Sequence, residues 1–225
     1  MKLNIPALET RTDARDLVGE KLIKLIPASC ERVLLIHPPH IPESDFLLER
    51  ALNRRYWSYD PYGAGVLCYN LEARGYKTDI LDINYEILAH AHEDPANFRY
   101  SIWEDKLTEK LNSFKPHLVG ISCMFTMSHQ SVKLIASAIK KYDTNLPIIG
   151  GGVHLSNARK LVLEDCEDID FIGVYECDKS LPDLIDFING KLPKENLTQL
   201  ATTINGEFVS FEDRATPSSH EIEAS

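Results

Sequence analysis

The sequence predicts an α/β fold, a Rossmann-like doubly wound sheet of five parallel strands with a C-terminal β-hairpin. First, short apolar runs alternate along the chain with longer runs whose apolar residues recur at helical spacing, as in a parallel sheet covered on both faces. Second, a strand–helix–strand unit in the middle of the chain ends in three glycines at 150–152. Third, Asn205-Gly206 lies between two alternating segments and is typical of a type I′ hairpin turn.

The central unit contains the edge of the sheet where we expect a ligand. Apolar runs at 118–121 and 147–149 predict two buried strands, and residues 130–142 between them have one apolar helical face. Ligands of such sheets bind beyond the carboxyl ends of the parallel strands. The residues expected there are 122–126 and 150–154, which combine hydroxyl groups with bare glycine backbone.

The elements before this unit follow from the same periodicities. We expect an N-terminal helix from Arg11 to Ile26 that Pro27 ends. The aromatic-rich insertion at 43–60 is either a functional loop or a surface helix. The other expected elements are a strand at 33–36, a helix at 60–74, a strand at 76–83, a polar loop at 84–100 and a helix at 100–114.

The elements after the glycines complete the domain. We expect a helix at 157–163, a strand at 169–174, a helix at 181–188 and hairpin strands at 201–204 and 207–211, with a disordered tail from Glu212. The predicted boundaries are 1–30 for an N-terminal helical extension, 31–195 for the α/β domain, and 196–225 for the hairpin and tail.

Composition excludes several classes of function. The net charge of −10 does not provide the basic surface that nucleic-acid binding needs, and no apolar run approaches the length of a membrane span, so we expect a cytoplasmic protein. The five cysteines are odd in number and lack metal-ligand spacing, so we expect reduced thiols and find no iron–sulfur cluster motif. His37, His40, His90 and His92 are expected to be solvated loop residues rather than metal ligands.

Three common classes of protein with this architecture are excluded by the residues at the strand ends. A receiver domain needs an aspartate where Ser122 or Cys123 stands. A flavodoxin needs a phosphate loop where Pro38-Pro39 follows the first strand, and a nicotinamide fold needs Gly-x-Gly-x-x-Gly at the same point.

A fourth class of protein fits these residues, because the sequence resembles the cobalamin-binding domain found at the N-terminus of B12-dependent radical SAM enzymes. The resemblance extends over about residues 31–211, and the order and spacing of its pieces make it specific. The matching pieces are the first strand with Pro38-Pro39, then Pro61-x-Gly63, Leu67, Leu71-Glu72, Arg74-Gly75-Tyr76, 81–84, 115–122, 151–154, Asp170-Phe171-Ile172, Glu176 and Leu181-Pro182-x-Leu184.

The resemblance implies that cobalamin lies across the strand ends with its nucleotide tail inserted into the domain. Ser122, Met124 and Thr126 are then expected to line the tail channel, and Gly151 and Gly152 to let the tail pass against backbone. The full set of cofactor-binding residues expected by this resemblance is Tyr62, Gly63, Ser122, Met124, Thr126, Gly150, Gly151, Gly152, Val153, His154, Tyr175 and Glu176.

The sequence departs from the family in three places. It has no Asp-x-His-x-x-Gly motif, so no histidine is expected to ligate cobalt from below. Tyr175-Glu176-Cys177-Asp178 stands where relatives have Gly-Glu-Gly-Glu, and Tyr175 is expected either to stack on the ligand or to obstruct it. Relatives also continue into a catalytic barrel with a Cys-x-x-x-Cys-x-x-Cys cluster site, which this chain lacks.

Three functions therefore stay open at this point. The first is a cobalamin-binding module, not catalytic alone, whose partner is a radical SAM domain or subunit that performs methyl transfer or related chemistry. The second is a degenerate interaction or sensory domain that binds no cobalamin. The third is a small-molecule enzyme that uses Ser122, Cys123 or His154, for which no nucleophile paired with a base is visible in the sequence.

Overall fold

A single mixed sheet organises the protein. The structure, a computed structural model, describes residues 14–26 and 28–213. The strand order is β2-β1-β3-β4-β5-β6-β7, with the first five strands parallel and β6 and β7 antiparallel, which confirms the predicted fold class. The strands are β1 (Arg32–His37), β2 (Lys77–Asp82), β3 (Leu118–Ser122), β4 (Ile148–Gly151), β5 (Phe171–Gly173), β6 (Leu200–Ile204) and β7 (Glu207–Phe211). The hairpin extends the parallel sheet, because β6 pairs with β5.

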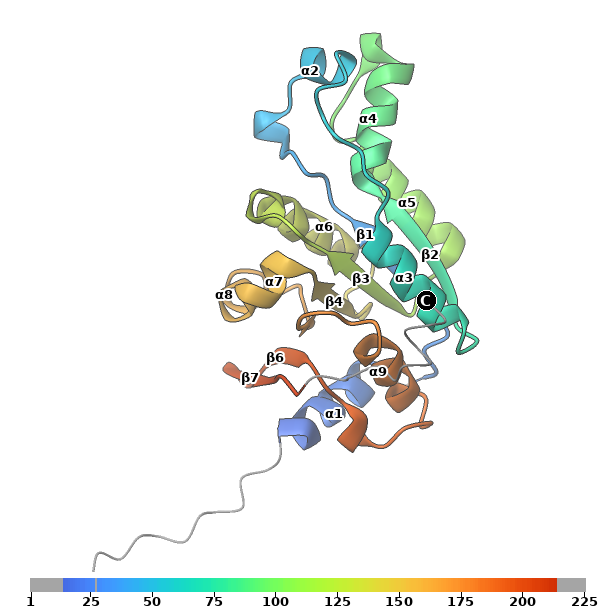
Figure 1. Cartoon of the computed structure of the whole chain (residues 1–225), viewed down its shortest axis with the longest axis vertical. Coiled ribbons are helices and arrows are strands. Elements are labelled where there is room, and N and C mark those ends of the chain that lie inside the picture. The colour runs from blue at the N-terminus through green and yellow to red at the C-terminus, as the bar shows by residue number, and fades with distance from the viewer. Residues whose placement is uncertain (1–13, 27, 214–225) are drawn as a thin grey trace, which may run out of the picture.

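Helices cover both faces of the sheet (Figure 1). The α-helices are α1 (Ala14–Leu25), α2 (Leu48–Leu52), α3 (Tyr62–Glu72), α4 (Ile83–Glu93), α5 (Ile102–Phe114), α6 (His129–Tyr142), α7 (Val153–Asn157), α8 (Arg159–Asp165) and α9 (Ser180–Ile188). Single 3-10 turns are η1 (Glu43–Asp45), η2 (Pro95–Asn97), η3 (Thr126–Ser128) and η4 (Lys194–Asn196). Helices α4 to α8 pack on one face of the sheet, and α1, α3 and α9 pack on the other.

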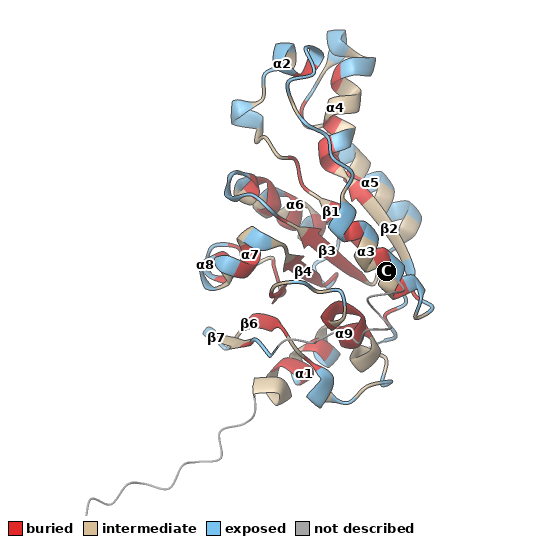
Figure 2. Cartoon of the chain, in the orientation of Figure 1, coloured by how far each residue is buried: buried red, intermediate tan, exposed pale blue. Residues whose placement is uncertain are grey.

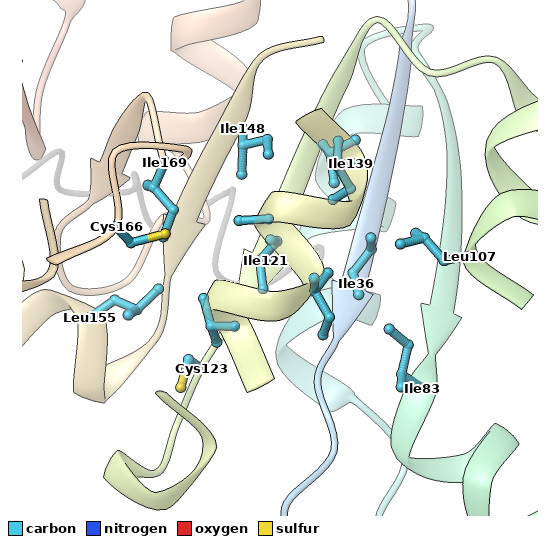
Figure 3. Close-up of a cluster of buried hydrophobic side chains, with 14 of the residues drawn as sticks. Ile36, Ile83, Leu107, Ile121, Cys123, Ile139, Ile148, Leu155, Cys166 and Ile169 are labelled. Atoms are coloured by element: carbon cyan, nitrogen blue, oxygen red, sulfur yellow. The ribbon is translucent and has the colours of Figure 1, made fainter. Parts of the chain in front are cut away.

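Alternating strand residues divide the core into two layers. Ile36, Ile121 and Ile148 point toward α6, where Ile139 meets them (Figure 3). Their neighbours Leu35 and Ile149 point to the other face, which α1, α3 and α9 cover. The central strands are consequently buried on both sides, while the outer surfaces of the helices are exposed (Figure 2). This double burial explains why the strands appear in the sequence as unbroken apolar runs.

The helical connections that follow β1 and β3 lie on opposite faces of the sheet. The crossover from β1 to β2 runs through α3 on one face, and the crossover from β3 to β4 runs through α6 on the other. The loops that follow β1 and β3 therefore part from each other at the carboxyl edge of the sheet. In open α/β sheets this switch point forms the crevice in which ligands bind.

Two sequence-based expectations are corrected by the structure. The predicted polar loop at 84–100 is mostly helix, because Ile83, Ile87 and Ala91 form a buried stripe along α4 and the Asp82 carboxylate caps its first turn. The predicted helix at 157–163 is instead two short helices, α7 and α8, separated at Ala158. The other predicted helices and strands are present within a few residues of their expected ends.

The remaining expectations have mixed outcomes. The insertion at 43–60 contains η1 and the short helix α2, which are followed by an irregular segment from Arg54 to Pro61. Asn205 and Gly206 both have positive φ, as the hairpin turn requires. The expected helix start at Arg11, its end at Pro27 and the tail beyond residue 213 lie outside the described residues.

Helix α1 packs against the hairpin of β6 and β7. Val18 and Leu22 are buried together with Phe171, Leu200 and Phe211. The ammonium group of Lys21 donates to Asp170 O at 3.0 Å, to Thr202 Oγ1 at 2.6 Å and to Thr203 O at 3.1 Å. The N-terminal helix is thus part of the same core as the last two strands.

Candidate functional site

A row of polar and small residues crosses the carboxyl edge of four strands. His37 is in register with Asp82 of β2, and Ser122 is in register with Gly151 of β4. Because Ile36 pairs with Ile121, His37 and Ser122 stand at the same level of the sheet. All four residues alternate with side chains of the α4–α8 face, so they face the side that α3 covers. The predicted pair Ser122 and Gly151 therefore forms the β3–β4 half of this strip, beside the switch point between β1 and β3.

The three glycines after β4 have different structural roles. A Cβ on Gly150 would lie 2.7 Å from Leu155 Cδ1, so this glycine makes room for core packing. A Cβ on Gly152, which has φ of 93°, would lie 2.5 Å from Cys123 O, so the backbone itself requires glycine there. A Cβ on Gly151 would meet no atom within 4 Å. Only Gly151 therefore leaves open space that a ligand could fill.

The loop after β3 presents an apolar surface next to this space. Met124, Phe125 and Met127 are all exposed large side chains on a loop between buried Cys123 and the start of α6. Backbone bonds tie the loop to the glycines, since Cys123 N donates to Gly151 O at 2.8 Å and His154 N donates to Cys123 O at 3.2 Å. Burial raises the pKa of the Cys123 thiol to about 11, so it is not an activated nucleophile.

A chain of four side chains runs outward from this loop. Thr126 Oγ1 lies 3.2 Å from His154 Nδ1, and His154 Nε2 lies 3.1 Å from His129 Nδ1. His129 Nε2 lies 2.9 Å from Asp165 Oδ2, which Lys133 also contacts at 2.9 Å. The sequence predicts Thr126 and His154 as site residues but not His129 and Asp165. Their spacing of 36 residues gives no pattern, although His129 at the first position of α6 and Asp165 at the last of α8 could have been paired once the sheet order was known.

A second histidine pair lies on the other side of the switch point. His37 Nδ1 lies 3.1 Å from Asp82 Oδ1, and its Nε2 lies 3.1 Å from His40 Nε2. The His40 ring meets the edge of Phe125, with ring centroids 5.4 Å apart. Burial, and next the neighbouring His37, lower the pKa of His40. These residues are half-buried and hydrogen-bonded, unlike the solvated loop histidines that the sequence predicted.

No metal-binding cluster accompanies these histidines in the described part of the chain. Within residues 14–26 and 28–213, no group of three or more histidine, cysteine, aspartate or glutamate side chains could hold a metal ion. Over the same residues, no helix is long and apolar enough to cross a membrane.

Tyr175 has a left-handed backbone conformation, which is uncommon for a residue other than glycine. Its φ is 64°, and its N–H donates to Ser156 Oγ at 3.0 Å. Its hydroxyl donates to Glu212 Oε2 at 3.1 Å, and Glu212 also pairs with Arg159. The ring therefore reaches toward the end of β7. Glu176 is exposed, and its carbonyl accepts a hydrogen bond from Gln199.

The remaining predicted residues lie at the outer rim. Val153 is exposed at the start of α7. Tyr62 and Gly63 are exposed at the start of α3, which lies at the carboxyl edge because the crossover helix runs antiparallel to the strands. Trp57 and Tyr59 are stacked with ring centroids 5.8 Å apart on the segment before α3. The structure thus gathers the predicted residues along one edge of the sheet.

Comparison with known proteins defines the class to which this arrangement belongs. The family model described as the B12 binding domain matches residues 53–185, more than half of the chain. The protein belongs to the B12-binding domain family. Within that family it resembles the cobalamin-binding part of B12-dependent radical SAM methyltransferases.

Individual relatives agree with this assignment. Cytidylyl-2-hydroxyethylphosphonate methyltransferase of Streptomyces wedmorensis is 25% identical over 174 residues, which are 76% of this chain and 31% of that protein. The radical S-adenosylmethionine methyltransferase TsrM of Kitasatospora setae, solved with cobalamin and a 4Fe–4S cluster, superposes with a TM-score of 0.61 at 19% identity over 84% of this chain and 30% of TsrM. The cobalamin-dependent radical enzyme OxsB, solved with aqua-cobalamin and S-adenosylmethionine, gives 0.56 at 15% identity over 89% of this chain and 28% of OxsB. The chain spans about a third of the length of these relatives.

Proposed function

We propose that this chain binds cobalamin across the carboxyl edge of β1, β3 and β4 and presents it to a radical SAM catalytic unit. The observation that supports this most directly is the open space over Gly151, which lies in register with Ser122 beside the switch point. A long ligand tail needs such a position, because a side chain there would occupy its path. The family match, over residues 53–185, includes the carboxyl ends of β3 and β4.

The chain's own residues have distinct tasks in this proposal. Ser122 and Thr126 offer hydroxyl groups to the ligand, and the exposed Met124 gives it an apolar contact. The exposed start of α3, with Tyr62 and Gly63, closes the strip from the other side. The remaining residues of the site are Gly150, Gly152, Val153, His154, Tyr175 and Glu176, which shape the loops around it. When bound, cobalamin supplies a cobalt centre for methyl transfer, while the protein supplies binding and orientation.

The chain is proposed to act with a partner rather than alone. Burial keeps the Cys123 thiol protonated at neutral pH, which argues against a nucleophilic role for it. Full-length relatives named as methyltransferases are about three times as long as the region that this chain matches. We therefore place the chemistry on a radical SAM domain or subunit that docks over the exposed strand-end loops.

Cobalamin retention by Gly151 variants tests the proposal. The purified chain is titrated with hydroxocobalamin, desalted and examined by ultraviolet–visible spectroscopy, and we expect about one cobalamin per chain. Gly151→Leu should lower retention at least about tenfold, because a Cβ at this position meets no protein atom and the longer side chain is expected to extend into the path of the ligand. Gly151→Ala is the matched control and should keep most of the binding, and thermal melting should show that both variants are folded.

A different result would favour the interaction-domain function. If the folded wild-type chain retains no cobalamin, the site does not hold this ligand. Equal retention by wild type and Gly151→Leu would move the ligand away from Gly151 and contradict the site proposed above. Gly152 is unsuitable for this test, because any side chain there disturbs the backbone of Cys123 whether or not a ligand binds.

A further inference from the structure

The side-chain relay from Thr126 to Asp165 has a definite direction. One end is the exposed Thr126 hydroxyl on the strand-end loop, and the other is the half-exposed Asp165 carboxylate at the end of α8. His154 and His129 join the two ends through contacts of 2.9 to 3.2 Å. In such a chain the donor or acceptor role of one group fixes the role of the next. The reason is that a neutral imidazole has one nitrogen that donates and one that accepts.

Asp165 sets the direction at the outer end. A hydrogen bond from His129, and then one from Lys133, hold the pKa of the Asp165 carboxyl below its usual range, so it is ionised and can only accept. His129 must then donate from Nε2. In the neutral ring this leaves Nδ1 as an acceptor, and the atom that faces it is His154 Nε2.

The donor and acceptor roles of His154 and Thr126 follow in the same way. Burial, with a further contribution from His129, lowers the pKa of His154 and favours its neutral ring. If His154 donates from Nε2 to His129, its Nδ1 is an acceptor and faces Thr126 Oγ1. The only hydrogen available for that contact is the hydroxyl hydrogen of Thr126.

We propose that this relay commits the Thr126 hydroxyl hydrogen to His154, so that the threonine oxygen faces the ligand only as an acceptor and selects a primary carboxamide over a carboxylate. The inference rests on the proposed function, since cobalamin has peripheral carboxamide groups whose N–H hydrogens such an acceptor would take. A carboxylate in the same place would meet the lone pairs of Thr126 and lose a hydrogen bond. His154, His129 and Asp165 are positioning residues, and Thr126 is the residue that contacts the ligand.

The relay itself is tested in the protein without ligand. Long-range nitrogen–proton NMR at about pH 8, where imidazoles are mostly neutral, should show both His129 and His154 protonated at Nε2 and free of hydrogen at Nδ1. Asp165→Asn should shift His129 and His154 toward mixed tautomers, because an amide can either donate or accept. A His154 ring protonated at Nδ1 in the wild type would overturn the inference.

The selectivity is tested with cobalamin and its three monocarboxylic acids, each with one propionamide hydrolysed. We expect at least one acid to bind the wild type roughly tenfold or more weakly than cobalamin, as for a ligand group left without its partner. The ratio of the acid's dissociation constant to that of cobalamin should fall toward one in Thr126→Val and in Asp165→Asn. Thr126→Ser should keep the ratio of the wild type. Glu164→Gln removes the same charge from the same helix outside the relay and should also keep it.

The outcomes separate the two proposals. If the wild type binds cobalamin but its ratio for every acid is unchanged in Thr126→Val and Asp165→Asn, the selectivity inference is wrong and the proposed function stands. If Glu164→Gln lowers the ratio as much as Asp165→Asn, net charge is the cause and the relay is not. If the wild type binds no cobalamin, the proposed function fails and the ligand half of the inference fails with it.

Discussion

Gly151 and Gly152 show how neighbouring residues of one type can have opposite requirements. The sequence presents both as bare backbone for a ligand. In the structure, Gly152 has φ of 93° and ψ of 170° and lies directly against the Cys123 backbone, whereas Gly151 has ordinary strand geometry and open space. In our proposal Gly151 leaves room for the ligand, whereas Gly152 is required by the conformation of the chain itself.

Gly152→Ala is expected to destabilise the protein strongly. The backbone region that Gly152 occupies is nearly restricted to glycine, and the new Cβ would approach Cys123 O to 2.5 Å, so we expect a loss of at least about 3 kcal/mol in the free energy of unfolding. Gly151→Ala is the control and should change it by less than about 1 kcal/mol. Urea denaturation measures both, and equal losses would contradict the distinction.

At the level of single residues, prediction from sequence reached the strand ends but not their outer partners. Ser122, Thr126, Gly151 and His154 could be placed because buried strands have a recognisable end. His129 and Asp165 could not, since a hydrogen bond between two helices leaves no periodicity in the sequence. The left-handed conformation of Tyr175 was equally hidden, because it depends on contacts with Ser156 and Glu212.

Helices α3 and α9 are joined by a buried ion pair network. Arg74, just beyond α3, donates to Asp183 Oδ1 and to Asp186 Oδ2 of α9, each at 2.7 Å. The Asp183 side chain is only 4% exposed, and it also accepts from Lys179 at 2.8 Å. The pairing offsets burial of the carboxylates and fixes how the two helices sit on the sheet.

Arg74→Met is expected to lower the free energy of unfolding by roughly 2 to 4 kcal/mol, because it leaves the buried Asp183 carboxylate and the partly buried Asp186 carboxylate with less compensation. Lys106→Met provides the matched control. That lysine lies 3.4 Å from Glu86 on the surface, and its loss should cost less than about 1 kcal/mol. Urea denaturation at neutral pH distinguishes them, and similar costs for both variants would count against the network.

Element by element, the sequence predicts strands better than it predicts short or polar helices. Every predicted strand is present. Double burial makes the central strands β1, β3 and β4 recognisable as apolar runs, and the turn at Asn205-Gly206 identifies β6 and β7. Helix α4 was missed because its buried stripe of Ile83, Ile87 and Ala91 is narrow and is surrounded by polar residues. The position of β6 beside β5 was also out of reach, because pairing between distant strands is decided by packing and not by local propensity.

For the molecule as a whole, three histidines make stability depend on pH. Burial is the main cause that lowers the pKa values of His40, His117 and His154 below the ordinary 6.5. Between the folded and unfolded pKa values, the unfolded chain binds more protons than the folded one. The stability that these rings support is therefore fully present above pH 6.5 and is lost as the pH falls through the folded pKa values.

We expect the melting temperature to fall when the pH is lowered from about 7.5 to about 5.5, and to fall less in His40→Gln. The variant removes one of the rings whose protonation opposes folding. His92→Gln changes an exposed histidine of α4 and should leave the pH dependence as in the wild type. Differential scanning calorimetry at the two pH values measures the effect, and an identical pH dependence in all three proteins would disprove the role of His40.

The packing of α1 on the hairpin also fixes the order of events during synthesis. Lys21 is made early, yet its partner Thr202 lies 181 residues further along the chain. At roughly 5 to 20 residues per second, the ribosome needs about 10 to 40 s to bridge that interval. During this time Val18 and Leu22 have no Leu200 or Phe211 to cover them. Helix α1 is thus completed well before the hairpin that covers it, and its apolar face is a natural target for chaperones in the interval.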